Sequence, residues 1–541
     1  MRRLALVGLL TAACAPRVVP ATPVEEPPAA APYERAPSPD VGPIRQAAAQ
    51  LWHDETLASA NGWRAGKTPD RVSLPEALRT TDAVAAIRAA RAASPSGTDD
   101  SIALLHLESF LASETIGRAA VEAQTAFLSQ LVQTKVRLRG SDDVPLMQLE
   151  ERLAQEPSAV QRAQISAAES PALAPLEALV QRRHEVIRTA AIALGYTDLD
   201  ALRALVGEAS VDSSLLLAEA VLAATQPFFE ASKREIADHT LGITDGRLRL
   251  ADLPRLARAG VPDADFSPGT TLPKVRALLG ALGLAVDEAR LHFDAEPAPE
   301  RLPGALFLAP SSSEVMLLVR DVGGVDSARS LLRAAARAEA VLHCNTTSLD
   351  LCVLGGGAIR AAQSALFDDL ADDPLWLREA TALRGARLDE AVHGAALRRL
   401  LLVRHAAARV LFAHASPDAY TTIFSRALGV PIEGSEATRW PLEADDWMES
   451  ADRLRGFLLA AQIRETLIGA ASGEHWWTPT GAAPLVAFWS QGTRPSPMAI
   501  DASAFVRLAT SRLAYRAPDP PPPTPPRPVV KHTKHRKRRR K

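Results

Sequence analysis

Residues 176–195 read LEALVQRRHEVIRTAAIALG, and this stretch decides the class of fold. Apolar side chains recur in it every three or four residues, at Leu176, Leu179, Val180, Ile187, Ala191 and Leu194. Charged side chains fill the positions between them, and Gly195 follows as a residue that commonly ends a helix. The pattern predicts an amphipathic α-helix that buries one face.

The same helical spacing continues outward through most of the chain. Clear apolar stripes of this period run through residues 213–231, 272–284 and 454–470. Only one region has the alternation typical of strands, in three short runs at residues 292–295, 305–309 and 314–320. We therefore predict a mainly α protein whose large helical body spans residues 44–513, with a small β-sheet inserted at residues 292–320.

Composition excludes several classes of protein. The chain has 541 residues, 47 % of them hydrophobic and 23 % charged, which is unlike a disordered chain, a collagen or a polytopic membrane protein. That length allows three or four domains of about 150 residues, or one large helical body. Three cysteines cannot make a disulfide-rich scaffold, and no CxxC pair is present to hold a structural zinc.

The N-terminus has the parts of an export signal. Arg2 and Arg3 precede a short apolar run that ends in small residues directly before Cys14. Residues 1–14 resemble a bacterial lipoprotein signal, in which that cysteine is lipidated and anchors the protein to a membrane of the cell envelope. A plain secretory signal or a chance apolar start is the alternative. Residues 15–43, rich in Pro and Ala, are predicted to be a disordered tether.

The C-terminus, residues 514–541, combines a proline-rich spacer with a basic tail. The basic tail, residues 531–541, begins at Lys531, ends at Lys541 and contains eight Lys or Arg. Without it the chain has 53 basic and 63 acidic residues, a net charge of −10. Such a tail attracts polyanions without sequence preference. In an exported protein these would be anionic lipids or cell-wall polymers rather than nucleic acid, or the tail only aids solubility.

Motifs for catalysis are missing. The sequence contains no GxSxG elbow, no β-lactamase set and no HExxH motif among its twelve histidines. The closest approach is His184-Glu185, which has Arg188 where the second histidine is needed.

Several segments nevertheless resemble the thimet oligopeptidase and oligoendopeptidase F family of helical zinc peptidases. They are residues 314–320 followed by Gly323-Gly324 and a helix, then residues 365–370, 373–377, 427–432, 461–464 and 474–477. The resemblance covers most of the body. It implies a helical zinc-peptidase-like fold, a small sheet that lines a peptide-binding cleft, and active-site helices within residues 322–377.

The family's zinc site is not retained in this alignment. The HExxH positions match Arg333, Ala334 and Arg337, and the third ligand, a Glu on the next helix, matches Ala361. A register three residues later would place equally inert side chains there: Ala336, Arg337 and Ala340. A catalytic zinc needs about three protein ligands and a water position. The resemblance therefore implies degenerate active-site helices, no catalytic residue and no zinc.

The cleft itself is expected to remain. Peptides can pair with an exposed sheet edge, and residues 314–320 are predicted to be that edge. Arg333 and Arg337, one helical turn apart, would line the floor and could bind a carboxylate or phosphate. Alternatively, both arginines form salt bridges with neighbouring acids such as Glu339.

Cys344 and Cys352 are eight residues apart. In an oxidising envelope they could form a disulfide that closes residues 345–351 into a loop, and otherwise they are two buried thiols.

The leading hypothesis is a non-catalytic, peptide-binding or scaffolding lipoprotein of the bacterial envelope. The second is an active metallopeptidase with an unrecognised ligand set, such as His343 with Asp368 or Asp369. The third is a structural linker between the membrane, through the lipid on Cys14, and anionic envelope polymers, through the basic tail.

Overall fold

The computed structural model describes residues 40–518, except for residues 139–142, 245–247, 285–289, 297, 472–474 and 497. The predicted signal with Cys14, most of the tether and the basic tail lie outside the described residues.

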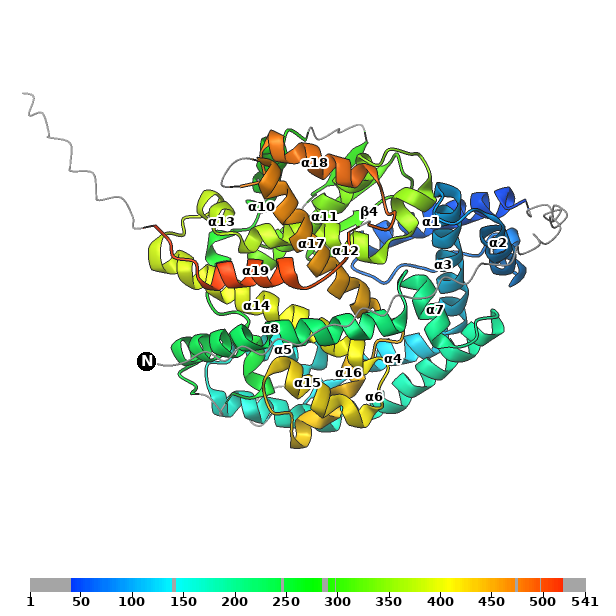
Figure 1. The fold of residues 1–541 in the computed structure, drawn as a ribbon. Coiled ribbons are helices and arrows are strands. Elements are labelled where there is room, and N and C mark those ends of the chain that lie inside the picture. Colours follow the sequence, from blue (N-terminus) through cyan, green and yellow to red (C-terminus); the bar gives the residue numbers. More distant parts are fainter. Residues whose placement is uncertain are drawn as a thin grey trace, which may run out of the picture. The chain divides into compact units, whose positions relative to one another are not determined.

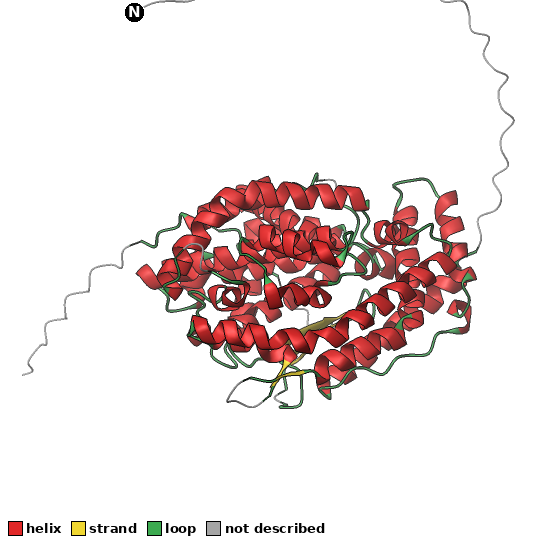
Figure 2. Cartoon of the chain, turned by 90° about the horizontal axis from the view of Figure 1, so that it is seen from below, coloured by secondary structure: helices red, strands yellow, loops and turns green. Residues whose placement is uncertain are grey.

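Helices make up most of the described chain (Figure 1; Figure 2). The α-helices among the described residues are α1 (Gly42–Arg64), α2 (Asp82–Ala93), α3 (Asp99–Ala119), α4 (Val121–Gln133), α5 (Leu149–Gln155), α6 (Ala159–Ala193), α7 (Leu199–Val206), α8 (Val211–Leu241), α9 (Leu253–Leu256), α10 (Thr271–Ala281), α11 (Val325–Leu342), α12 (Gly357–Asp368), α13 (Pro374–Ala380), α14 (Gly385–Phe412), α15 (Tyr420–Leu428), α16 (Trp440–Glu443), α17 (Glu449–Ala471), α18 (Pro479–Ser490) and α19 (Ser503–Leu513).

The stretch at residues 176–195 forms the second half of α6. Leu176, Val180, Ile187 and Ala191 are buried, as the spacing predicts. Gly195 follows the helix with φ +82°, a conformation that favours glycine. At its other end α6 extends to Ser158, whose side chain accepts a hydrogen bond from the Gln161 N–H.

The inserted sheet has three strands, β3 (Leu291–Asp294), β4 (Gly304–Leu308) and β5 (Val315–Arg320). Their order is β3-β5-β4: β5 pairs in parallel with β3 and antiparallel with β4. The prediction that residues 314–320 form the edge was therefore wrong, because both backbone edges of β5 are already paired. A two-stranded sheet of β1 (Lys135–Val136) and β2 (Val144–Pro145) was not predicted, since two-residue strands show no alternation.

Helix α11 is the central helix of the site region. Its alanines, among them Ala334, Ala335 and Ala338, are buried, and they let neighbouring elements approach closely. β4 and β5 pack on α11, α12 packs beside it, and α17 packs against α12. Elsewhere α8 and α14 run side by side (Figure 1).

Buried ion pairs join the end of α12 to several helices distant in sequence. Nη2 of Arg399 on α14 lies 2.5 Å from the Asp368 carboxylate and 2.9 Å from that of Asp372. Arg329 on α11 also donates to Asp372. Charges buried this deeply need such partners, so the network fixes how α11, α12 and α14 meet.

No helix in the described part of the chain is both long and apolar enough to cross a membrane.

Candidate functional site

A pocket of about 1240 Å³ lies between β4, α11, α12 and the start of α17, with α1 and α3 on its other side. Most of the charged side chains that line it come from α11, α12, α14 and α17: Arg333, Arg337, Arg360, Asp368, Arg398, His405, Arg409, Glu449, Asp452 and Arg453. Aromatic rings of Trp52, Phe110, Phe307, Trp447 and Phe457 complete the wall.

Three of the four positions that match the family's zinc site line this pocket. They are Arg333 and Arg337 on α11 and Ala361 on α12. Ala334 is 5 % exposed and belongs to the hydrophobic core. The fold thus places the three positions that match the family's zinc ligands on one pocket. The side chains there are two guanidinium groups and a methyl group.

The charge of Arg333 is compensated within the protein. Its Nη1 lies 3.3 Å from Oδ1 of Asp368, and its side chain is 49 % exposed. Burial acts to raise the pKa of Asp368, but the charges of Arg399, Arg329 and Arg333 outweigh it and hold that pKa below its ordinary value. The predicted partner of the arginines, Glu339, instead lies 3.3 Å from the ring of His343.

Arg337 lacks a carboxylate partner among the described residues. It donates to the amide oxygen of Gln363, and its guanidinium lies 5.2 Å from the centre of the Phe307 ring. Burial, together with the charge of Arg360, lowers the pKa of Arg337 to about 9. Burial and the nearby charge of Arg360 therefore both disfavour the protonated, positively charged form of Arg337.

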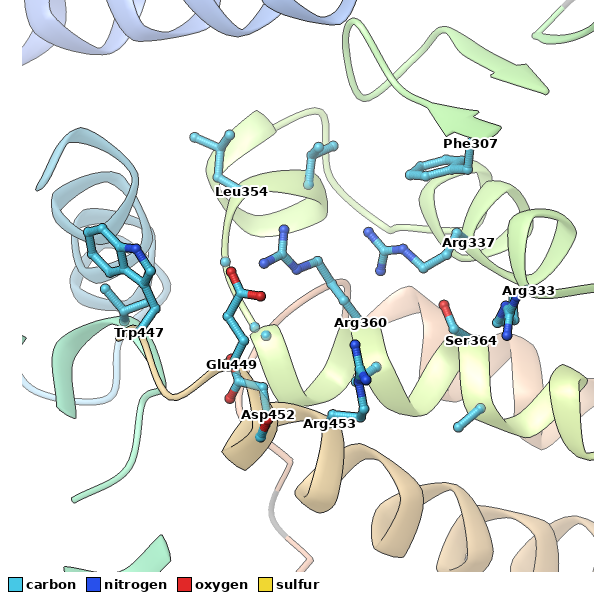
Figure 3. A pocket seen from close by; sticks show the side chains of 18 of the residues that line it. Phe307, Arg333, Arg337, Leu354, Arg360, Ser364, Trp447, Glu449, Asp452 and Arg453 are labelled. Atoms are coloured by element: carbon cyan, nitrogen blue, oxygen red, sulfur yellow. The ribbon is translucent and has the colours of Figure 1, made fainter. Parts of the chain in front are cut away.

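Arg360 projects from α12 into the same part of the pocket (Figure 3). No hydrogen bond or ion pair joins it to another residue that the structure describes. Burial lowers the pKa of Arg360, although the more distant charges of Asp452, Glu208 and Glu449 act in the opposite direction.

Carboxylates gather beside Arg360 at the start of α17 (Figure 3). Burial raises the pKa of Asp452 to about 7, and the negative charges of Glu208 and Glu449 act in the same direction. Asp452 can approach the first turn of α12 only because Gly357 has no side chain; a Cβ there would lie 1.9 Å from Oδ2 of Asp452.

The edge strand that faces the pocket is β4. Ser330 accepts from the N–H of Ala305 and donates to its C=O, and the Trp52 indole donates to the C=O of Ala309. Backbone groups alternate along an antiparallel strand, so Phe307, midway between these residues, turns its N–H and C=O to the same free edge. No hydrogen bond to another described residue occupies them.

The alternative metal ligands are not brought together. His343 contacts Glu339 and stacks on Trp489, with ring centres 5.9 Å apart. Asp368 and Asp369 are held by arginines: Nη1 of Arg512 lies 2.6 Å from Oδ1 of Asp369. Within the described ranges, no group of three or more His, Cys, Asp or Glu is placed to hold a metal ion.

Cys344 and Cys352 are joined by a disulfide, with Cα atoms 5.9 Å apart. The bond anchors the middle of a π-helical turn, Asp350–Leu354, whose Val353 and Leu354 line the pocket.

The sequence analysis missed Arg360, Asp452 and the edge groups of Phe307. Arg360 directly precedes Ala361 in the sequence, so extending the search to the residues next to the matched positions would have reached it. Whether Arg360 has an ion-pair partner depends on which acidic residues, distant in the sequence, lie near it in the fold. Sequence spacing does not show this.

Comparisons with known proteins place the fold but not a family. No family model matches the chain, and no curated protein matches it. Among solved structures 142 chains match. One of them, provisionally identified as an oligoendopeptidase F, is 13 % identical, with a TM-score of 0.56 over 81 % of each chain. The prediction of a mainly α, oligopeptidase-like fold is confirmed.

Proposed function

We propose that this chain is a peptide-binding protein that uses a peptidase-like fold without peptidase chemistry. The observation that carries the proposal is the pocket itself: the positions that match the zinc ligands line it, and they hold Arg333, Arg337 and Ala361. A guanidinium has only donors and stays protonated, and a methyl group has no lone pair. These residues do not fit a catalytic zinc, so no hydrolytic step is assigned.

The free edge of β4 supports peptide binding. An extended peptide could pair with the N–H and C=O of Phe307, between the positions already occupied by Ser330 and Trp52. Aromatic side chains around the pocket, including Phe110 and Trp447, would supply apolar contact area.

A random octapeptide library tests this function. The full chain is incubated with the library, and mass spectrometry measures both the peptides retained and any cleavage products. We expect intact peptides to be retained, and zinc after dialysis to be far below one per chain. Peptide cleavage that a zinc chelator stops would show that the chain is a peptidase. Retention no greater than on an unrelated helical protein would refute peptide binding.

Two substitutions at one position test the proposed edge. Phe307→Pro removes the N–H, which an edge strand tolerates, whereas Phe307→Ala removes only the ring. Since one hydrogen bond contributes about 0.5–1.5 kcal/mol, we expect the Pro variant to bind roughly 3- to 10-fold more weakly than the Ala variant. Equal affinities would mean that peptides do not pair with β4.

The location of the protein is a separate part of the proposal. Export and lipid anchoring at Cys14 rest on the N-terminal sequence, and the polyanion attraction of residues 531–541 rests on their charge. Incorporation of a labelled fatty acid in a bacterial host should be lost in Cys14→Ser. Removal of residues 531–541 should abolish sedimentation with anionic lipid vesicles at low salt.

A further inference from the structure

Two cations without carboxylate partners occupy the same part of the pocket. Arg337 comes from α11 and Arg360 from α12, and within the described chain neither forms an ion pair (Figure 3). Most other arginines in this wall are compensated: Arg333 by Asp368 at 3.3 Å and Arg398 by Asp372 at 3.3 Å. Arg337 and Arg360 therefore lack the direct ion pairs that Arg333 and Arg398 form, although the charges of Asp452, Glu208 and Glu449 still act on Arg360.

The surroundings orient the guanidinium of Arg337. Gln363 accepts from Nη1 of Arg337, and the Phe307 ring covers one side of its guanidinium. The repulsion between the two charges contributes to the lowered pKa of Arg337. An anion placed between two guanidinium forks would receive several charge-assisted hydrogen bonds and would remove that repulsion.

We propose that Arg337 and Arg360 together bind a carboxylate of the peptide held against β4. This inference rests on the proposed function and specifies its ligand: a peptide whose C-terminal carboxylate, or whose Asp or Glu side chain, reaches the guanidinium pair. Because Phe307 belongs to β4 and its ring covers Arg337, the free backbone edge and the cationic pair are neighbours. A peptide paired with Phe307 can therefore present a carboxylate to them.

A carboxylate is a better ligand for the two guanidinium groups than a metal ion or a neutral group. The binding atoms are all N–H donors, and both donor groups are planar forks that match two carboxylate oxygens.

Four octapeptide libraries test the inference with the full chain. Two contain Asp and Glu and two lack them, and within each pair one has a free C-terminal carboxylate and the other a C-terminal amide. We expect the library that lacks every carboxylate to be retained at least 10-fold less than the library that carries both kinds. Two libraries carry only one kind of carboxylate, and the one of these that is retained more strongly identifies which carboxylate is bound.

Substitutions then locate the binding site. Arg337→Gln and Arg360→Gln should each reduce retention of the carboxylate libraries about 10-fold or more, and should leave the neutral library unchanged. Arg453→Gln is the matched control, because Arg453 lines the same pocket, is exposed and also forms no described ion pair. It should change retention less than 3-fold. Arg360→Gln removes no hydrogen bond, so the variant should fold, which its circular dichroism and Tm will verify.

The possible failures are distinguishable. If the neutral library binds as well as the others, or if Arg453→Gln weakens binding as much as Arg360→Gln, the carboxylate site is refuted while peptide binding stands. If no library is retained, the proposed function itself fails.

Discussion

Nη1 of Arg333 lies 3.3 Å from Oδ1 of Asp368, so the position that matches the family's first zinc ligand is joined to α12, the helix that carries the position matching the third. Oδ2 of Asp368 also lies 2.5 Å from Nη2 of Arg399. Arg333 is therefore part of the buried ion-pair network around Asp368. Arg337, one turn later on α11, forms no ion pair with any carboxylate of that network. The two arginines that look equivalent in the sequence have different surroundings in the structure.

Arg333→Gln should leave peptide retention within about 3-fold of the native protein. Its charge is already neutralised by Asp368, whose carboxylate Arg399 continues to hold in the variant. Retention is measured beside Arg337→Gln, which has the same chemical change one turn along α11. A loss in Arg333→Gln equal to that in Arg337→Gln would show that both arginines contact the ligand.

Asp372→Asn should lower the free energy of unfolding by about 3–5 kcal/mol. Asp372 is fully buried and its carboxylate is shared by Arg329, Arg398 and Arg399, which the variant leaves without their full countercharge. Urea unfolding monitored by circular dichroism measures the change. Asp326→Asn, in a pair that is 68 % exposed on the Asp side, is the control and should change it by less than about 0.5 kcal/mol. Equal effects would contradict the importance of the buried network.

Asp452→Asn should stabilise the protein at pH 8 by about 1–3 kcal/mol. The pKa of Asp452 is about 7 in the folded protein and 3.8 as the ordinary value, so between these values the folded state binds more protons than the unfolded state. The contribution of Asp452 to the free energy of unfolding is fully present below pH 3.8 and is lost as the pH rises through 7. The Asn variant lacks this loss. Its advantage in Tm should therefore disappear near pH 4; an advantage that is independent of pH would point to another cause.

Removal of the disulfide should destabilise the protein by about 2–3 kcal/mol, because a short closed loop constrains the unfolded chain. The test compares the Tm of the native protein and of the double variant Cys344→Ala, Cys352→Ala, with and without dithiothreitol. The reductant should lower the Tm of the native protein only. A native Tm that does not respond to dithiothreitol would mean that the two thiols are free in solution.

Much of the helical fold could be predicted because helical periodicity is a local signal. The stripe at Leu176, Val180 and Ile187 reports which face of α6 is buried, whatever that face packs against. The three short strands were likewise found within a residue of their bounds. Strand order was not, since β5 pairs with β3 and β4 through contacts that the alternation pattern does not contain.

The sequence by itself determined which residue types stand at the positions that match the family's zinc ligands: the side chains of Arg333, Arg337 and Ala361 offer no lone pair to a metal in any packing. Only the tertiary structure decided which charges remain available. Arg333 is compensated because the end of α12 brings Asp368 beside it. Arg360 lacks an ion-pair partner among the described residues because the carboxylates at the start of α17 stay beyond ion-pair distance. Charge compensation depends on distances of a few ångströms between separate helices, and those distances exist only after the chain has folded.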